Sequence, residues 1–379
     1  MSKILIVDTE TTTSNKGNPF DTTNKLVCIG TKWRGEKSEI NYLFKPVNNF
    51  LKEANIVVGF NTKFDLHWLR KVGYNIENIV VWDCQIAEFL LECQEKKYIS
   101  LDDTLLKYNL PLKLDVVKTE YWEKGIDTDN IPKEILSNYL EQDLICTELV
   151  FERQVEQFQT THKHLFPLFK LCCQDLLVLE EMEWNGIKFN TEKAMERVKE
   201  LNAKLQEIKC SIDGFVGNIP YSLSSDYHLS AILYGGTILE DFRVPIGVYK
   251  SGSKIGQTRY SVHIKKYECE GLVNPLKGTE NHEKVSKKEL TYVEKGILTE
   301  VRKFWEVNED VLKQLKAKGK AKELINLIIE YNKIDKLCKT YLLGWSNLIK
   351  EMNWEKDTLH PQLNQCVVIT GRLSSSKPN

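Results

Sequence analysis

The sequence has no long apolar run, no cysteine motif and almost no net charge. Because no stretch of about 18 apolar residues occurs and the N-terminus leads straight into a strand-like segment, we expect neither a membrane span nor a secretory signal. The ten cysteines include no Cys-x-x-Cys pair, a pattern typical of reduced thiols. These absences predict a cytoplasmic protein.

The small net charge hides an uneven distribution. The formal charge is −1, yet between Val311 and Thr340 eight lysines stand against three acidic residues. Such a stretch is either a solvated helix surface or a phosphate-binding surface. With 379 residues, of which 42% are hydrophobic, the chain is expected to be globular and to form more than one domain.

The first 155 residues predict a mixed α/β unit. Short apolar runs bounded by turn residues predict strands over 3–8, 25–32, 40–45, 56–60 and 80–83. Helical periodicity with capping residues predicts helices over 63–72, 84–93, 100–108 and 132–156. We expect the helices to pack over the strands.

The second half is mostly helical. Periodicity predicts helices over 166–184, 190–212, 311–315, 321–327 and 331–349. Residues 235–300 are rich in glycine and lysine and contain short β-like runs at 260–264 and 290–293. This segment predicts an inserted hairpin region.

Four acidic residues and a tyrosine lie on elements that could bring them together. Asp8 and Glu10 are two residues apart on the first strand and so share a face. Asp65 begins the helix after the fourth strand, and Tyr139 and Asp143 share one face of a long helix. Each piece alone is most often a cap, a packed tyrosine or a solvated acid. Their joint occurrence, in this order, predicts a nuclease site.

Converging carboxylates repel one another unless cations lie between them. A ligand set made only of oxygen atoms suits Mg²⁺ or Mn²⁺. We therefore predict that divalent cations bind among these acids.

The motifs that contain these residues resemble a known family. VDTETT (7–12), GFNTKFD (59–65) and YLEQD (139–143) match the three motifs of DEDD-type 3′→5′ exonucleases, and Tyr139 marks the tyrosine subgroup. The resemblance implies a ribonuclease-H-like α/β fold. It also implies that two divalent ions, Mg²⁺ or Mn²⁺, are held by Asp8, Glu10, Asp65 and Asp143.

The same resemblance implies roles for neighbouring residues. Two ions about 3.5–4 Å apart would clamp the attacking water and the leaving 3′-oxygen, releasing nucleoside 5′-monophosphates. Tyr139 would orient the water, because a tyrosine with a pKa near about 10 is a poor base at neutral pH. Asn61 would touch the terminal nucleotide or cap the helix, and Asp83 would be a structural hydrogen-bonding residue. An aromatic residue would stack on the terminal base, with Phe20, Phe60 and Phe64 as open choices.

Segments of the second half resemble family A DNA polymerases of the DNA polymerase I type. They are MEWNGIKFN (182–190), SLSSDYHLSAILYGG (222–236), NEDVLKQL (308–315), IEYNKIDKLCKTY (329–341) and TGRLSSSKPN (370–379). Asn190 and His228 depart from the usual Asp and Gln. The resemblance implies an exonuclease domain over 1–158. A mainly α-helical thumb and the start of the polymerase domain would follow over 159–379, with a β-containing insert over 240–303.

The resemblance also implies DNA as the partner. The exonuclease site would take a single-stranded 3′ end and the thumb a primer–template duplex. Lys333 and Lys336 are candidates for phosphate contacts, which position DNA without reading its sequence. Arg372 could reach minor-groove acceptors that every base pair presents. A salt bridge that stabilises its turn is the alternative.

The polymerase motifs of the family's palm and fingers are missing. Asp-x-Ser-x-x-Glu, Arg-x-x-x-Lys followed by Tyr-Gly, and Val-His-Asp-Glu do not occur. We therefore expect no polymerase activity from these residues alone. A second chain would supply the missing half, as in a split polymerase, or the sequence is a truncated polymerase; the architecture suggests a phage enzyme acting in the host cytoplasm. Two alternatives to a proofreading exonuclease stay open: a non-catalytic subunit that clamps DNA, and a stand-alone RNA-trimming exonuclease.

Overall fold

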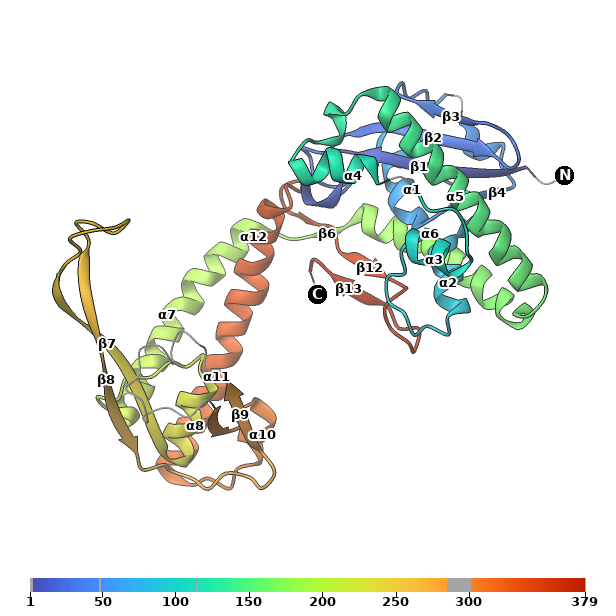
Figure 1. Ribbon diagram of the computed structural model, residues 1–379. Helices are drawn as coiled ribbons and strands as arrows, with labels where there is room; N and C mark the ends of the chain where they lie inside the picture. The colour runs from blue at the N-terminus through green and yellow to red at the C-terminus, as the bar shows by residue number, and fades with distance from the viewer. Residues whose placement is uncertain (1–2, 48, 114, 285–300, 379) are drawn as a thin grey trace. The chain divides into compact units, whose positions relative to one another are not determined.

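The computed structural model describes residues 3–47, 49–113, 115–284 and 301–378. The chain divides into two compact units (Figure 1). One comprises Met1–Thr191 together with Trp345–Asn379, and the other Glu192–Gly344. The predicted β-like run at 290–293 lies outside the described residues.

A five-stranded mixed sheet is the framework of the first unit. Its strands, in the order β3-β2-β1-β4-β5, are β3 (Ser38–Asn41), β2 (Leu26–Trp33), β1 (Ile4–Thr11), β4 (Ile56–Gly59) and β5 (Val81–Asp83). β2 runs antiparallel to β1 and β3, whereas β4 runs parallel to β1 and β5. The central strand β1 is almost entirely buried, as its apolar sequence requires. All five strands were predicted, although β3 lies further toward the N-terminus than residues 40–45.

Helices cover this sheet. α1 (Thr62–Lys71) follows β4, α2 (Cys84–Leu91) follows β5, and α5 (Lys133–Gln159) packs across β1, β2 and β3. α5 approaches β2 closely because Gly30 has no side chain; a Cβ atom there would lie 2.8 Å from Cγ of Leu140. Between α2 and α5 in the sequence lie α3 (Leu101–Lys107), whose first turn is capped by Ser100, and α4 (Val116–Glu120).

α6 (Phe166–Asn185) belongs to the first unit. It packs against α1, α2 and β5, and Phe169, Cys173 and Leu176 join the main core. The last residues return to this unit, where β11 (Thr358–Leu359) pairs with β6 (Ile187–Lys188) and β12 (Gln362–Asn364) pairs with β13 (Ser374–Ser376). The compact units therefore do not follow the expected boundary between residues 158 and 159, because helical periodicity does not reveal which core a helix joins. The division into exonuclease and thumb regions stays a prediction.

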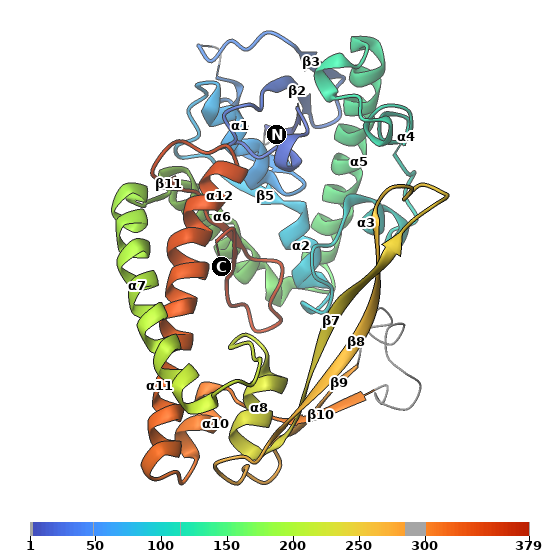
Figure 2. The ribbon, with the colours of Figure 1, turned by 90° about the vertical axis from the view of Figure 1, so that its left-hand side faces the viewer.

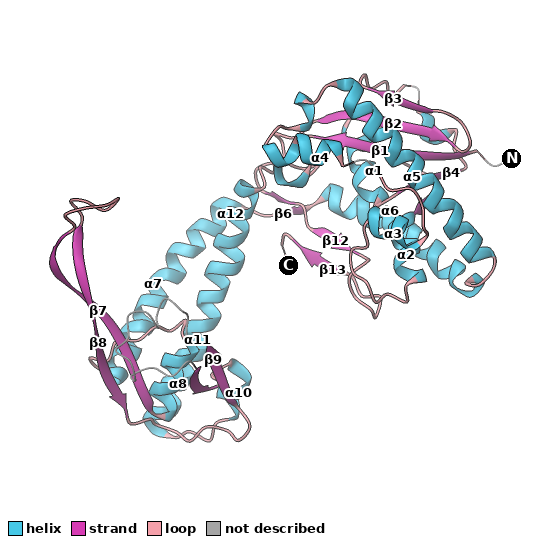
Figure 3. Ribbon diagram, in the orientation of Figure 1, coloured by secondary structure: helices cyan, strands magenta, loops and turns pink. Residues whose placement is uncertain are grey.

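The second unit combines helices with an antiparallel ribbon (Figures 2 and 3). α7 (Thr191–Val216), α8 (Asp226–Tyr234), α10 (Glu309–Gln314) and α11 (Gly319–Lys336) supply most of its core. β7 (Gly236–Val248) and β8 (Thr258–Cys269) form the long ribbon. β9 (Glu280–Lys284) pairs with β10 (Val301–Trp305).

Two predictions for the second half need correction. The helices expected at 321–327 and 331–349 are not separate: α11 leads directly into the π-helix η6 (Leu337–Leu343) and then α12 (Gly344–Glu351). Buried Ile328 continues the apolar stripe of α11 across the expected gap. The run at 260–264 is part of a 12-residue strand. None of the described helices is both long and apolar enough to cross a membrane.

Candidate functional site

β1, α1 and α5 supply the predicted acidic residues. Glu10 of β1, Asp65 of α1 and Asp143 of α5 are buried, and Asp8 of β1 is partly buried. β1 continues through Thr11, so Asp8 and Glu10 lie within the strand and not at its end. Tyr139 lies one helical turn before Asp143 and is also buried.

The charges of these acids interact. Burial, and then the charge of Asp143, raises the pKa of Asp8 to about 7. Burial followed by the charges of Asp8 and Asp143 raises the pKa of Glu10 well above its usual value. The pKa of Asp65 is raised by burial and then by Asp8. The fold thus brings Asp8 within electrostatic reach of Glu10, Asp65 and Asp143.

Thr9 fixes part of this arrangement. Its hydroxyl group donates a hydrogen bond of 2.6 Å to Oδ1 of Asp65, and its backbone N–H donates one of 3.0 Å to Oδ1 of Asp8. One residue of β1 therefore holds acids from two elements. The sequence analysis missed this role, although Thr9 stands between two of the predicted ligands.

Lys113 is a second residue that the sequence analysis missed. Its Nζ atom lies 3.4 Å from Oδ2 of Asp143 and 3.3 Å from the hydroxyl oxygen of Tyr139. The positive charge of Lys113 lowers the pKa of Asp143, but burial outweighs it and the pKa of Asp143 is raised overall. No motif around Lys113 signals this position.

Tyr139 keeps its proton at neutral pH. Burial, and then the negative charges of Asp143, Glu10 and Asp8, raise the pKa of its hydroxyl group far above the usual value. The hydroxyl group hydrogen-bonds Asp143, and the edge of the Trp122 ring holds the tyrosine ring at a centroid distance of 5.9 Å. Tyr139 is therefore suited to donate a hydrogen bond and unsuited to act as a base.

The chemistry of the acids fits divalent cations. Oδ1 of Asp143 is buried and has no hydrogen-bond partner among the described residues, and Asp8, Glu10 and Asp143 share one nearby lysine, Lys113. Hard cations such as Mg²⁺ and Mn²⁺ prefer such oxygen ligands. Within the described part of the chain, however, no three or more His, Cys, Asp or Glu side chains are already arranged to hold a metal ion. Binding would require the carboxylates to reorient.

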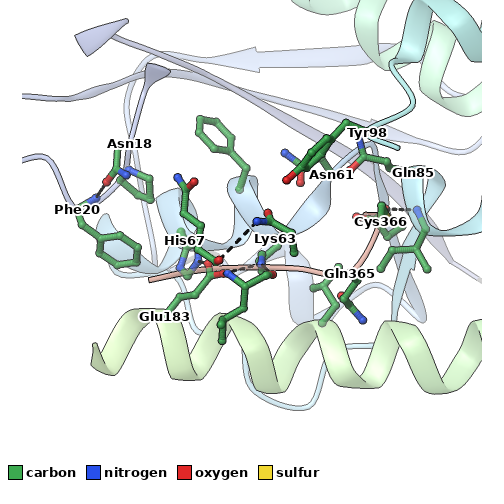
Figure 4. Close-up of a pocket in the computed structure, with 18 residues that line it drawn as sticks. Asn18, Phe20, Asn61, Lys63, His67, Gln85, Tyr98, Glu183, Gln365 and Cys366 are labelled. Atoms are coloured by element: carbon green, nitrogen blue, oxygen red, sulfur yellow. Dashed lines mark hydrogen bonds and ion pairs between the residues drawn. The ribbon is translucent and has the colours of Figure 1, made fainter. Parts of the chain in front are cut away.

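A cavity of about 260 Å³ lies beside the start of α1 (Figure 4). Its lining includes Asn61, Phe64, Phe20 and Tyr98, but none of the four predicted acidic ligands. Asn61 has a left-handed backbone conformation, with φ of 62°, and its side chain makes no capping hydrogen bond to the described backbone. Capping therefore does not explain this asparagine. Phe20 and Phe64 line the cavity, and Phe60 does not. Phe60 and Phe64 both pack against the main core.

Asp83 is structural, as predicted. Its carboxylate accepts hydrogen bonds from the backbone N–H groups of Thr62, at 2.6 Å, and Ile86, at 2.8 Å. These bonds join the starts of α1 and α2.

The candidate DNA contacts of the second half differ in their surroundings. Lys333 pairs with Glu309 at 3.1 Å. Lys336 and Arg372 are exposed, and neither forms an ion pair with any residue that the structure describes. The salt bridge considered for Arg372 is therefore not observed in this part of the chain. Contact of all three with DNA stays a prediction.

Comparison with known proteins agrees with this arrangement. Residues 3–153 match the family model described as 3′-5′ exonuclease, and residues 250–379 match that of DNA polymerase family A. DNA polymerase I of Borreliella burgdorferi is 25% identical over 100% of this chain and 35% of its own length. The DNA polymerase of Bacillus phage SP01 is 22% identical over 90% of this chain and 36% of its own length.

A solved structure has a similar fold. It is the POL domain of Pol1 from M. smegmatis in complex with DNA primer-template and dNTP, with a TM-score of 0.59 and 13% identity over 100% of this chain and 52% of that one. The chain thus spans about a third of the length of the curated relatives and half of this solved chain. The first unit contains a ribonuclease-H-like 3′–5′ exonuclease domain. The two matched models and the relatives show that the chain is similar to DNA polymerases of family A along most of its length.

Proposed function

We propose that this chain removes nucleotides from the 3′ end of DNA, as the proofreading exonuclease of a family A DNA polymerase. One observation carries the proposal. In addition to burial, Asp143 raises the pKa of Asp8 and Glu10, and Asp8 raises the pKa of Glu10 and Asp65, so acids from three separate elements interact beside a tyrosine that keeps its proton. Folding maintains such mutual repulsion at a cost in stability, which is typical of functional sites.

Asp8, Glu10, Asp65 and Asp143 would hold two Mg²⁺ or Mn²⁺ ions. When bound, these ions supply an activated water and neutralise charge on the scissile phosphate. The chain's own groups do the remaining work. Thr9 keeps Asp65 and Asp8 in place through its two hydrogen bonds. Tyr139 donates a hydrogen bond that aims the attacking water, and Lys113 adds positive charge beside Asp143.

The cavity beside α1 would receive the unpaired 3′-terminal nucleotide. Asn61, free of a capping role, offers an amide for hydrogen bonds, while Phe20 and Phe64 offer aromatic surface. Stacking on aromatic side chains is tolerant of base identity, which suits proofreading. The thumb region would hold the primer–template duplex, with Lys333, Lys336 and Arg372 as contacts.

The direct test is digestion of 5′-labelled single-stranded DNA and of a primer with a mismatched 3′ end. We expect Mg²⁺-dependent release of nucleoside 5′-monophosphates, which excess EDTA stops. Asp8→Ala with Glu10→Ala should abolish the activity, whereas Glu36→Ala with Glu39→Ala, two acids outside the site, should not. Tight DNA binding without digestion by the wild-type chain would favour a non-catalytic clamp. A strong preference for RNA 3′ ends would favour an RNA-trimming enzyme.

Polymerisation would need the palm and fingers, whose motifs are missing from these 379 residues. In a split polymerase, a second chain would supply them. Primer extension by a mixture of this chain with a palm-and-fingers polypeptide, but by neither alone, would establish that arrangement. The free state of all ten cysteines is consistent with action in the cytoplasm, the host's if the enzyme is viral.

A further inference from the structure

The outer part of the β7–β8 ribbon is basic, and the proposed active site does not use it. Between Phe242 and Lys266 the sequence has six lysines and arginines and neither aspartate nor glutamate. The whole chain, in contrast, has 52 basic and 53 acidic residues. The six residues are Arg243, Lys250, Lys254, Arg259, Lys265 and Lys266.

These charges face solvent without acidic partners. Every residue from Phe242 to Tyr260 is exposed. Among the residues that the structure describes, none of the six basic side chains forms an ion pair. Some lysines of the same unit are paired: Lys313 and Lys333 share Glu309, and Lys339 pairs with Asp335. The ribbon's charges are therefore available to an external anion.

The shape of the ribbon fits a groove of duplex DNA. Its two strands pair from Gly236 opposite Cys269 to Val248 opposite Thr258, and such strands lie about 4.8 Å apart. A two-stranded ribbon enters the major groove, which is about 12 Å wide. The 13 residues of β7 span about 40 Å, since each adds about 3.3 Å. In Figures 1 and 2 the tip stands clear of the helices of its own unit.

Exposed aromatic groups accompany the charges. The ring of Phe242 is 45% exposed and stacks on His263 at a centroid distance of 5.4 Å. Tyr249 and Tyr260 are exposed near the tip. Basic residues interleaved with aromatic ones are typical of surfaces that bind nucleic acid, whether single-stranded or duplex, so the aromatic groups support the class of ligand and the shape of the ribbon supports the duplex.

The acidic residues of the ribbon, Glu240, Asp241 and Glu268, lie at its base, so its outer part between Phe242 and Lys266 carries positive charge only. An uninterrupted positive stretch suits an evenly charged polymer better than one acidic patch on a protein.

We propose that the β7–β8 ribbon binds DNA through the sugar–phosphate backbone, with a preference for duplex. The choice of DNA as the ligand rests on the proposed function. The inference assigns a role to the β-containing insert, which the exonuclease chemistry does not require. Because phosphate contacts carry the interaction, binding should be independent of sequence and strongly dependent on salt.

The test compares two variants of the full chain that lose equal charge. The ribbon variant carries R243Q, K250Q, K254Q and R259Q. The control carries K37Q, K52Q, K163Q and K170Q, four exposed lysines of the first unit. Affinity for a 30-base-pair duplex and for a 30-nucleotide single strand is measured in EDTA over a range of salt concentrations. Thermal unfolding confirms that each variant is folded.

For the ribbon variant we expect at least about a tenfold loss of duplex affinity and a salt slope shallower by up to about 3.6, at about 0.9 per lost phosphate contact. In the control variant, the duplex affinity and the salt slope should both change less than in the ribbon variant. Unchanged duplex affinity in the ribbon variant, or an equal loss of duplex affinity in the control, would overturn the proposal. A protein would then be the better candidate for the ligand of the ribbon. A loss confined to single strands would overturn the duplex preference.

A small substrate separates this proposal from the proposed function. Cleavage of the p-nitrophenyl ester of thymidine 5′-monophosphate involves no second binding site, so the ribbon variant should cleave it at the wild-type rate. A wild-type chain that binds duplex through the ribbon but cleaves no substrate would reject the exonuclease and leave the ribbon proposal intact.

Discussion

The Nζ atom of Lys113 lies 3.4 Å from Oδ2 of Asp143, and the two residues are 30 positions apart in the sequence. This lysine lowers the pKa of three of the acids, Asp8, Glu10 and Asp143, in the metal-free site. It therefore partly replaces the divalent cations that the acids are suited to bind. Its neighbour Tyr139 lies within hydrogen-bonding distance of the same ammonium group.

Lys113→Gln should destabilise the metal-free protein at pH 8. Removing the charge leaves buried carboxylates without a counter-charge, and we expect a loss of about 1–3 kcal/mol in the free energy of unfolding. Mg²⁺ should restore stability more strongly in this variant than in the wild type, because cation and lysine compete for the same acids. Urea denaturation with and without Mg²⁺ measures both effects. Lys113→Arg keeps the charge and is the control; equal Mg²⁺ effects in all three proteins would contradict the prediction.

The stability of the metal-free protein should fall as pH rises. The folded-state pKa of Asp8 is raised to about 7 and those of Glu10 and Asp65 are also raised, so the folded state holds protons that the unfolded chain has released. Their contribution is complete below about pH 4, the unfolded pKa, and for Asp8 it is lost as pH approaches about 7. We expect a loss of a few kcal/mol (order of magnitude) in EDTA, and a smaller loss in Mg²⁺.

Substitution of two aspartates, Asp8 and Asp21, should change the stability at pH 8 in opposite directions. Asp8→Asn should raise stability at pH 8 and flatten the pH dependence. Asp21 is buried, but hydrogen bonds from Thr23, Asn15 and Asn353 lower its pKa to about 2. Asp21→Asn should therefore destabilise the protein at pH 8. Melting curves at pH 5 and pH 8 decide the matter, and destabilisation by Asp8→Asn at pH 8 would refute the electrostatic account.

Glu183→Gln should be strongly destabilising. The buried carboxylate of this α6 residue accepts hydrogen bonds from Lys63 Nζ at 2.6 Å and from the backbone N–H of Leu363 at 2.6 Å, and its other oxygen lies 2.8 Å from His67 Nε2. Loss of its charge leaves Lys63 poorly paired beside the core, at a cost of about 3 kcal/mol. Urea midpoints at constant m-value provide the measurement.

Glu181→Gln is the matched control for this variant. Glu181 is 55% exposed and pairs with Arg70 at 2.7 Å on the surface of the same helix. Exposed pairs contribute less than about 1 kcal/mol. Similar losses in the two variants would show that burial of Glu183 does not determine its contribution.

Gly186→Ala should cost more than Gly125→Ala. Gly125, with φ of 76° and ψ of 17°, is in the left-handed region, which alanine adopts at a cost of about 1–2 kcal/mol. Gly186, with φ of 62° and ψ of −170°, is in a region that essentially only glycine adopts. A Cβ atom on Gly186 would also lie 2.6 Å from the backbone oxygen of Leu359, whereas one on Gly125 meets nothing within 4 Å. We expect about 2 kcal/mol of additional destabilisation at Gly186. Equal melting temperatures for the two variants would contradict this close approach of β6 and β11.

Local sequence was sufficient for the five strands of the sheet and for α1, α2, α3 and α5, and it placed the predicted acids on these elements. Alternation places Asp8 and Glu10 on one face of β1, and helical spacing places Tyr139 one turn before Asp143. The structural role of Asp83 also follows locally, because an acid at a strand-to-helix junction faces free backbone N–H groups. These features depend on residues a few positions apart, which the sequence displays directly.

Only the tertiary structure determined which distant residues meet. Lys113 contacts Asp143, and Lys63 contacts Glu183, which is 120 positions away in the sequence. Packing brings these side chains together, and the residues around each of them do not indicate the partner. The same reason explains why α6 joins the first unit although its periodicity records only that one face is apolar. Periodicity specifies a helix or strand and its buried face, while the choice of partner depends on the shapes of all the surfaces that fold together.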